Sequence, residues 1–81
     1  MKKENAYKYQ DRLFALGVRI GYLRRLKGIS QEQLAERAGI SMGFLSQIEA
    51  PSMAVGISLE TLFAIADALE MPPSKLLELD M

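Results

Sequence analysis

The chain has 81 residues, which is enough for one small domain with a single hydrophobic core. It contains no Cys and no His, so disulfides, thiolate metal sites and most nucleophile–base arrangements are excluded, and we expect no metal, no cofactor and no enzyme activity. No apolar run approaches the roughly 20 residues that a membrane span requires, and no signal peptide is visible, which favours a cytoplasmic location.

Lysine and arginine balance aspartate and glutamate at ten each, but the two signs are separated along the chain. Residues 1–27 hold eight basic and two acidic side chains, whereas residues 28–81 hold two basic and eight acidic ones. A folded protein can therefore present a basic face to an anionic partner without a basic total. The alternative is that most of these charges only keep a small bundle in solution.

The first helix is predicted from about Ala6 to Lys27, because apolar residues recur at helical spacing on one side. These residues are Leu13, Leu16, Ile20 and Leu23. Gly17 and Gly21 interrupt the pattern, and each lowers helix propensity by about 1 kcal/mol relative to alanine. They indicate either a close approach by another backbone or only a soft helix.

Residues 30–49 predict two short helices joined by a tight turn. Ser30 is a suitable N-cap and Gln33 can complete its capping box, Gly39 suits a backbone with positive φ, and a second cap follows at Ser41. The buried positions of the pair are Ala35, Ile40, Leu45 and Ile48. This spacing indicates a helix-turn-helix, whose second helix can enter the DNA major groove. An ordinary helical hairpin is the alternative.

Two further helices are predicted beyond this pair. Ser58 is the expected N-cap of the first, which runs to about Leu69, and Ser74 is the expected N-cap of a shorter one. The predicted fold is therefore an all-α, compact five-helix bundle with short connections. We expect residues 1–12 to form an N-terminal extension, partly helical or frayed, ahead of a domain over residues 13–81.

Several stretches carry a family resemblance. Residues 23–31 (Leu-Arg-Arg-Leu-Lys-Gly-Ile-Ser-Gln) lead into the motif, and residues 45–49 (Leu-Ser-Gln-Ile-Glu) close it. Together with residues 58–62, 65–69 and 72–77, they resemble the Cro/C1-type (XRE) family of helix-turn-helix transcriptional regulators. The resemblance covers about residues 16–79. It implies a lambda repressor-like DNA-binding domain.

The outward side of the second motif helix (about 42–49) is the side opposite its buried residues. Candidates for contact with base edges are Met42, Gly43, Ser46 and Gln47. The Gln47 amide can pair bidentately with adenine and Met42 can touch a thymine methyl, whereas Gly43 permits close approach to the groove floor. Plain solvent exposure is the alternative for Ser46 and Gln47.

Phosphate contacts can come from helix N-termini, whose free N–H groups suit an anion, and from exposed cations. The candidates are Gln31, Ser41, Arg19, Arg25, Lys27 and Arg37. The family resemblance also implies a phosphate contact at Gln31. It further implies that Arg24 and Glu49 form an inward ion pair with a structural role.

The loop 50–57 departs from the family pattern, since relatives often carry cations there and this chain has none. Fewer phosphate contacts and a shallow dependence of DNA affinity on salt are expected. An exposed apolar loop often contacts a partner, so we expect a homodimer contact. Its predicted residues are Met53, Val55, Ile57, Leu76, Leu79 and Met81. The alternative is that the loop folds onto its own core.

These residues and the resemblance together favour a sequence-specific transcriptional regulator that binds double-stranded DNA. It is expected to act as a homodimer on a palindromic operator, and the family resemblance favours a repressor. No membrane partner and no small-molecule ligand are expected. The subtype stays open among phage repressors, restriction–modification controllers and antitoxins. The alternative function is a protein-interaction module with weak or no DNA binding, which the zero net charge and the apolar loop favour.

Overall fold

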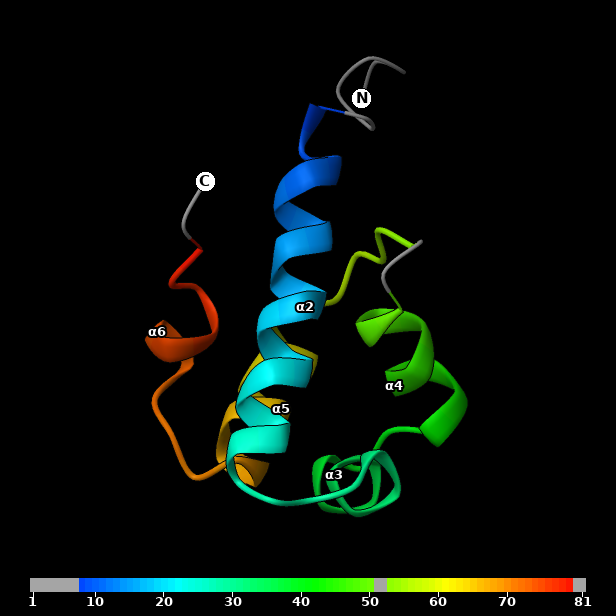
Figure 1. Ribbon diagram of the computed structural model, residues 1–81, viewed down its shortest axis with the longest axis vertical. Helices are drawn as coiled ribbons and strands as arrows, with labels where there is room; N and C mark the ends of the chain where they lie inside the picture. Colours follow the sequence, from blue (N-terminus) through cyan, green and yellow to red (C-terminus); the bar gives the residue numbers. More distant parts are fainter. Residues whose placement is uncertain (1–7, 51–52, 80–81) are drawn as a thin grey trace.

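The computed structural model describes residues 8–50 and 53–79, which form five helices with short connections (Figure 1). Their bounds are α2 Gln10–Leu26, α3 Gln31–Ala38, α4 Met42–Glu49, α5 Leu59–Ala68 and α6 Pro73–Leu76. The long helix α2 lies in front of α5, with α4 along one flank and α6 along the other. The described residues contain no strand, and the predicted all-α five-helix bundle is confirmed.

Local side-chain signals set the ends of the motif helices. Ser30 Oγ accepts a hydrogen bond from the Gln33 N–H at 3.1 Å, and Gln33 Oε1 accepts one from the Ser30 N–H at 2.9 Å, which completes the predicted capping box. Gly39 follows α3 with a φ of 71°. Ser41 and Ser58 cap α4 and α5 through their hydroxyls. These caps fix the turn that sets α4 across α3.

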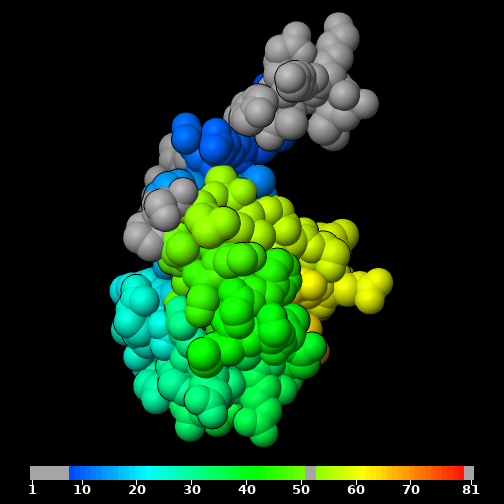
Figure 2. Space-filling view, turned by 90° about the vertical axis from the view of Figure 1, so that its right-hand side faces the viewer, coloured from blue at the N-terminus to red at the C-terminus, as the bar shows by residue number. Residues whose placement is uncertain are grey.

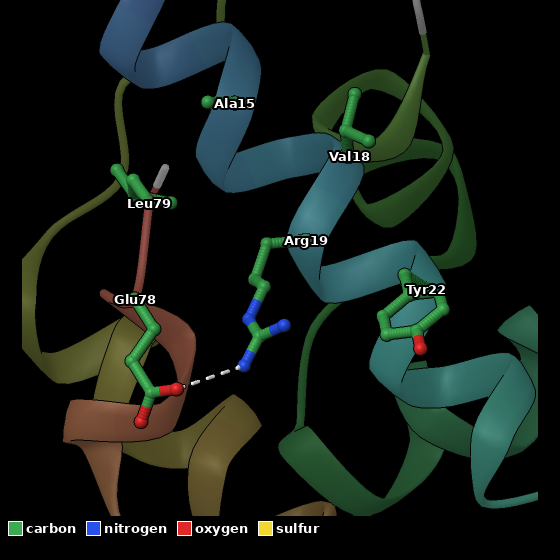
Figure 3. A pocket seen from close by; sticks show the side chains of 6 residues that line it. All are labelled: Ala15, Val18, Arg19, Tyr22, Glu78 and Leu79. Carbon is green, nitrogen blue, oxygen red and sulfur yellow. Dashed lines mark hydrogen bonds and ion pairs between the residues drawn. The ribbon is translucent and has the colours of Figure 1, made fainter. Parts of the chain in front are cut away.

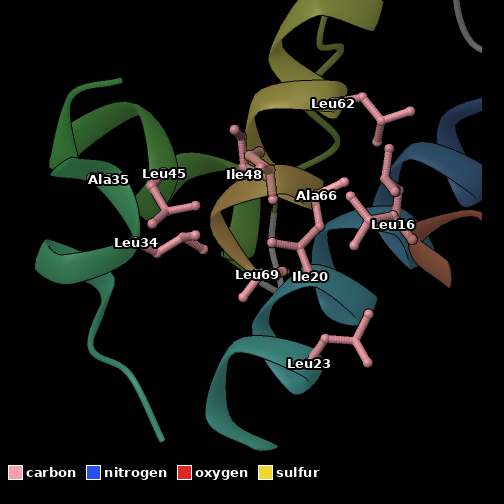
Figure 4. Packing of buried hydrophobic residues seen from close by; sticks show 12 residues of the cluster. Leu16, Ile20, Leu23, Leu34, Ala35, Leu45, Ile48, Leu62, Ala66 and Leu69 are labelled. Atoms are coloured by element: carbon pink, nitrogen blue, oxygen red, sulfur yellow. The ribbon is translucent and has the colours of Figure 1, made fainter. Parts of the chain in front are cut away.

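The hydrophobic core lies between α2, the helix pair α3–α4, and α5 (Figure 4). Its buried residues are Leu16, Ile20, Leu23, Leu34, Ala35, Leu45, Ile48, Leu62, Ile65, Ala66, Leu69 and Leu76. A fully buried Leu or Ile contributes about 1.5–3 kcal/mol, so this cluster dominates the stability of the fold. The core stripe predicted for the first helix is present, except that Leu13 is only half-buried.

Two glycines of α2 lie against the C-terminal end of α4. A Cβ atom on Gly17 would fall on the carbonyl oxygen of Ile48, and one on Gly21 would lie 3.0 Å from Glu49 Oε1. Close approach by another backbone, one of the two interpretations left open by the sequence, is therefore correct for Gly17, whereas Gly21 makes room for the Glu49 side chain. The missing side chains allow α4 to pack directly on α2.

The ends of two helices differ from the sequence prediction. Helix α2 begins at Gln10, inside the predicted extension 1–12, while residues 1–7 lie outside the described part of the chain. Helix α6 begins at Pro73, and Ser74 is not its N-cap. Proline suits the first helical position because its φ is already helical and its missing N–H would have had no partner there.

Candidate nucleic-acid interface

Helix α4 presents one side to solvent beside α3 and the C-terminal part of α2, which appear in green and cyan in Figure 2. Met42 is 50% exposed, Gly43 and Gln47 are also exposed, and Ser46 is half-buried. A Cβ atom added to Gly43 would meet nothing within 4 Å, so the fold itself does not require glycine there. The four predicted base-reading residues therefore share one accessible side of α4.

A chain of hydrogen bonds ties this side to the domain interior. The Ser46 hydroxyl donates to Gln31 Oε1 at 3.0 Å, and the Gln31 amide donates to Glu49 Oε1 at 3.1 Å. The Glu49 carboxylate also accepts from Arg24, through Nε at 2.9 Å and Nη2 at 3.0 Å. Arg24 Nη1 donates to the carbonyl oxygen of Ile29 at 2.8 Å. The network thus joins α2, α3 and α4.

The ion pair in this network is shielded from solvent. The side chains of Arg24 and Glu49 are 11% and 5% exposed. Their bidentate geometry satisfies both carboxylate oxygens, which offsets the cost of removing the charges from water. Arg24 is therefore occupied inside the protein and is not available for a DNA phosphate.

The side chains of Gln31 and Ser41 are also engaged within the protein. Gln31 bonds to Ser46 and Glu49, and Ser41 Oγ accepts from the Phe44 N–H at 3.0 Å. A phosphate contact at Gln31 would therefore use mainly backbone N–H groups, whereas the Ser41 hydroxyl only accepts within the protein and can still donate its O–H to a phosphate. The first turns of α3 and α4 have such groups without a helical partner, and their partial positive charge suits an anion.

The exposed cations are divided between the two flanks of α2. Arg25 and Lys27 are exposed near its C-terminal end, which is the end beside α3 and α4. Arg19 lies on the α6 flank, where Nε donates to the Lys75 carbonyl at 3.0 Å and Nη2 pairs with Glu78 at 3.4 Å. Arg19 is therefore turned away from the accessible side of α4.

Arg37, in the last turn of α3, lies in an acidic surrounding. It lines a shallow surface pocket together with Asp67 and Glu70, at the end of α5. Both carboxylates attract the guanidinium and reduce its availability for a phosphate. The fold does not bring Arg37 together with the exposed residues of α4.

The residues predicted for a homodimer contact are mostly used by the protein's own core. Leu76 is 0% exposed, so its prediction as an interface residue is wrong: α6 packs on α5 and α2 and turns this leucine inward. Three of the other predicted contact residues are half-buried against the same core: Val55, Ile57 and Leu79. Met53 is 41% exposed, and Met81 lies outside the described residues. The described part of the loop therefore folds largely onto its own core.

The sequence interpretation missed other exposed apolar side chains. On α2, Phe14, Val18 and Tyr22 are 37%, 46% and 49% exposed. On α5, Leu59 and Phe63 are exposed. A signal for the first three was present, because they are spaced four residues apart and form a second apolar stripe beside the core stripe.

A helix-turn-helix whose second helix has an accessible polar side is an arrangement that proteins insert into the DNA major groove. The fold and site thus define a DNA-binding protein of the helix-turn-helix class. Residues 20–76 match the family described as Helix-turn-helix (HTH_3), and the chain belongs to this family of Cro/C1-type (XRE) regulators. It is a DNA-binding transcription regulator, and family membership indicates a regulator rather than an enzyme.

A solved structure supports the same assignment. The restriction-modification controller protein C.AhdI from Aeromonas hydrophila is similar, with a TM-score of 0.73 and 33% sequence identity. The match covers 79% of this chain and 94% of the controller. No protein of curated function matches the chain. Among the described residues, no helix has the length and apolar character needed to cross a membrane.

Proposed function

We propose that the protein binds a palindromic, double-stranded operator as a homodimer and represses transcription from the adjoining promoter. The observation that carries this proposal is the exposed side of α4, where Met42, Gly43 and Gln47 face solvent and Ser46 is held in place from behind. A helix so arranged can enter the major groove with its N-terminal residues toward the base edges.

Base selection depends chiefly on Gln47. Its exposed amide can donate to N7 and accept from N6 of one adenine, a bidentate contact that discriminates against other bases by about 1–3 kcal/mol. Gly43 lets the helix approach the groove floor, and Met42 offers an apolar contact to a thymine methyl. The Ser46 hydroxyl donates to Gln31, so its free lone pairs can accept from a base.

Phosphate contacts would come from Lys27 and from the free backbone N–H groups at the starts of α3 and α4. These groups flank the exposed side of α4, so they can hold the backbone on either side of one major groove. Contacts of this kind set the position of the helix in the groove, and they leave sequence selection to the base-reading residues.

Two copies are proposed because one eight-residue helix makes few base contacts. A two-fold dimer reads two half-sites and places its α4 helices about 34 Å apart, roughly one turn of DNA. The similarity to C.AhdI favours a controller of a restriction–modification system over the other two subtypes, a phage repressor or an antitoxin. Repression would follow from an operator that overlaps the promoter of the controlled genes.

Selection of random duplexes by the purified protein at low salt tests this proposal. A palindrome with half-sites about one helical turn apart should be enriched. Gln47→Ala should abolish the preference at one position of each half-site and weaken binding to the selected operator by at least about 30-fold, because a bidentate contact worth about 1–3 kcal/mol is lost in each half-site. Gln10→Ala is the matched control, since Gln10 is an exposed glutamine at the opposite end of the molecule.

Two results would count against the proposal. If no sequence is enriched at low salt, the alternative of a protein-interaction module is favoured. If an operator is found, and the protein raises transcription of a reporter gene placed downstream of it, the protein is an activator.

A further inference from the structure

The outer side of α2 carries an apolar stripe, defined here as Phe14, Val18 and Tyr22, that no described helix covers. Figure 1 shows α2 in front of α5, and the partial exposure of the three side chains places them on the side of α2 away from the core. Three large apolar side chains in one row on a small domain are more than scattered surface residues, and such a row is typical of a contact surface.

A groove of about 310 Å³ runs beside the stripe, between α2 and the C-terminal segment (Figure 3). Its lining residues are Ala15, Val18, Arg19, Tyr22, Glu78 and Leu79. Arg19 and Glu78 pair with each other at 3.4 Å, so each already has a partner of opposite charge. The small side chain of Ala15 leaves room for a large apolar group from outside.

Charged residues at the two ends of the stripe indicate which kind of partner it can bind. Asp11 and Arg25 are exposed and lie seven residues before and after Val18, which places all three on the same side of the helix. No ion pair among the described residues involves Asp11 or Arg25. Such a stripe has one acidic end and one basic end. Two copies packed antiparallel would therefore bring each acidic end against the partner's basic end.

We propose that a second copy of this chain docks on the α2 stripe, with the two α2 helices packed antiparallel about Val18. Asp11 then lies opposite the partner's Arg25, and the reverse pair forms at the other end. In the same register Phe14 lies opposite the partner's Tyr22, and the neighbouring Ala15 leaves room for that ring in the groove. Arg25 thereby contacts the partner in place of the DNA phosphate predicted from the sequence.

This inference rests on the proposed homodimer and specifies its contact. The two-fold axis of this dimer is perpendicular to α2 and runs from the α4 flank to the α6 flank. Rotation about it reverses the direction of α2 but leaves the α4 flanks of both copies on one side of the dimer and the α6 flanks on the other. Both α4 helices therefore lie on the same side of the dimer, as binding to one DNA duplex requires.

The other exposed apolar pair does not suit a second copy. Leu59 and Phe63 of α5 have Glu60 and Asp67 close by on the same helix, and no basic residue lies in α5. Self-association through α5 would bring like charges together, which is unfavourable. The α2 stripe is therefore the better self-complementary surface.

Sedimentation equilibrium of the full chain from 1 to 100 µM tests the contact. The wild type should dimerise in this range. Val18→Glu should weaken dimerisation by at least tenfold, because it would place two carboxylates at the two-fold axis. Met53→Glu is the matched control, since Met53 is similarly exposed and belongs to the earlier predicted contact. Circular dichroism melting should show that both variants remain folded, since both sites are exposed.

Charge reversal gives a second, independent test. Asp11→Arg and Arg25→Asp should each weaken the dimer several-fold, and the double variant should recover most of the loss, since the opposite pairs are restored. A folded Val18→Glu protein that still dimerises, or the absence of recovery in the double variant, would overturn the inference while leaving the homodimer intact.

A wild type that stays monomeric at 100 µM would overturn both the contact and the homodimer. Base reading by α4 would still be judged separately, from the operator selection and the effect of Gln47→Ala on a single half-site.

Discussion

Glu49 is the residue on which three helices converge. Its carboxylate is 5% exposed and accepts hydrogen bonds from Arg24 of α2 and Gln31 of α3, while it ends α4 itself. A carboxylate this well shielded is tolerated only with its partners in place, because an unpaired buried charge costs several kcal/mol. The Arg24 side chain, which pairs with this carboxylate, therefore stabilises the fold.

Arg24→Ala should lower the free energy of unfolding by about 3–5 kcal/mol, because it leaves the Glu49 carboxylate buried without its partner. Lys27→Ala, which removes an exposed cation one turn further on, should leave the melting temperature nearly unchanged and weaken operator binding. Urea unfolding and a DNA titration of both variants check the pair. An Arg24→Ala protein with normal stability and lost DNA binding would show that Arg24 contacts phosphate.

Three described helices are followed by a residue in the left-handed conformation, beginning with Gly28 after α2. Gly39 follows α3 with a φ of 71°, and Glu70 follows the α5 cap with a φ of 56°. In each case the next N–H reaches back into the helix: Ile40 donates to the Ala35 carbonyl and Met71 to the Ala66 carbonyl, both at 3.0 Å. An L-residue in this region costs about 1–2 kcal/mol, so only the first of the two ends is unstrained.

Substitutions at these two ends should therefore have opposite signs. Glu70→Gly should stabilise the protein by about 0.5–1 kcal/mol by relieving backbone strain. Gly39→Ala should destabilise it by about 1 kcal/mol through strain alone, because a Cβ there would meet nothing within 4 Å. Thermal melts of both variants measure the difference. Equal shifts of the same sign would mean that conformational strain does not control these ends.

Across the whole molecule, few cations are free to contact DNA near α3 and α4. Arg24 is paired with Glu49, Arg19 is paired with Glu78, and Arg25 is assigned to the partner's Asp11 in the proposed dimer. Lys27 is left as an exposed cation on this part of each copy, whereas Arg37 lies beside Asp67 and Glu70. Affinity should therefore depend more on base contacts, and less on counterion release, than in a strongly basic DNA-binding protein.

The logarithm of the operator-binding constant should fall with the logarithm of salt concentration with a slope no steeper than about −4, a limit reached only if Arg37 contributes beside Lys27 in both copies. Lys27→Ala should make the slope shallower by about 2. Fluorescence anisotropy on the selected operator between 50 and 300 mM salt measures both values. A wild-type slope near −8 would require phosphate contacts from residues not assigned here.

How far the sequence predicts the structure depends on how local the cause is. The α3–turn–α4 unit is predictable because Ser30, Gly39 and Ser41 act within one helical turn of themselves. The packing of Gly17 on Ile48 is not, because it depends on a segment far along the chain, and the sequence left it open. Leu76 was assigned to the surface for the same reason: only the tertiary position of α6 turns it inward.

The candidate site follows the same division. The accessible side of α4 could be read from helical periodicity, and the exposure of Met42, Gly43 and Gln47 agrees with it. The hydrogen bond from Ser46 to Gln31 could not be predicted from periodicity, because it joins two helices whose approach is set by the turn between them. The sequence of α2 contains two apolar stripes, one with Leu16, Ile20 and Leu23 and one with Phe14, Val18 and Tyr22. Only the packing of the other helices determines that the first stripe faces the core.

The hydrogen-bond network also bears on how this regulator could change its target during evolution. Ser46 is the only one of the proposed base-reading residues in the described network. Met42 and Gln47 form no side-chain hydrogen bond within the described part of the protein, and Gly43 has open space around it. Substitutions at these three positions would thus alter operator preference at little cost to folding. A duplicated copy could acquire a new operator by drift at these sites alone, while a change at Ser46 would require a matching change at Gln31.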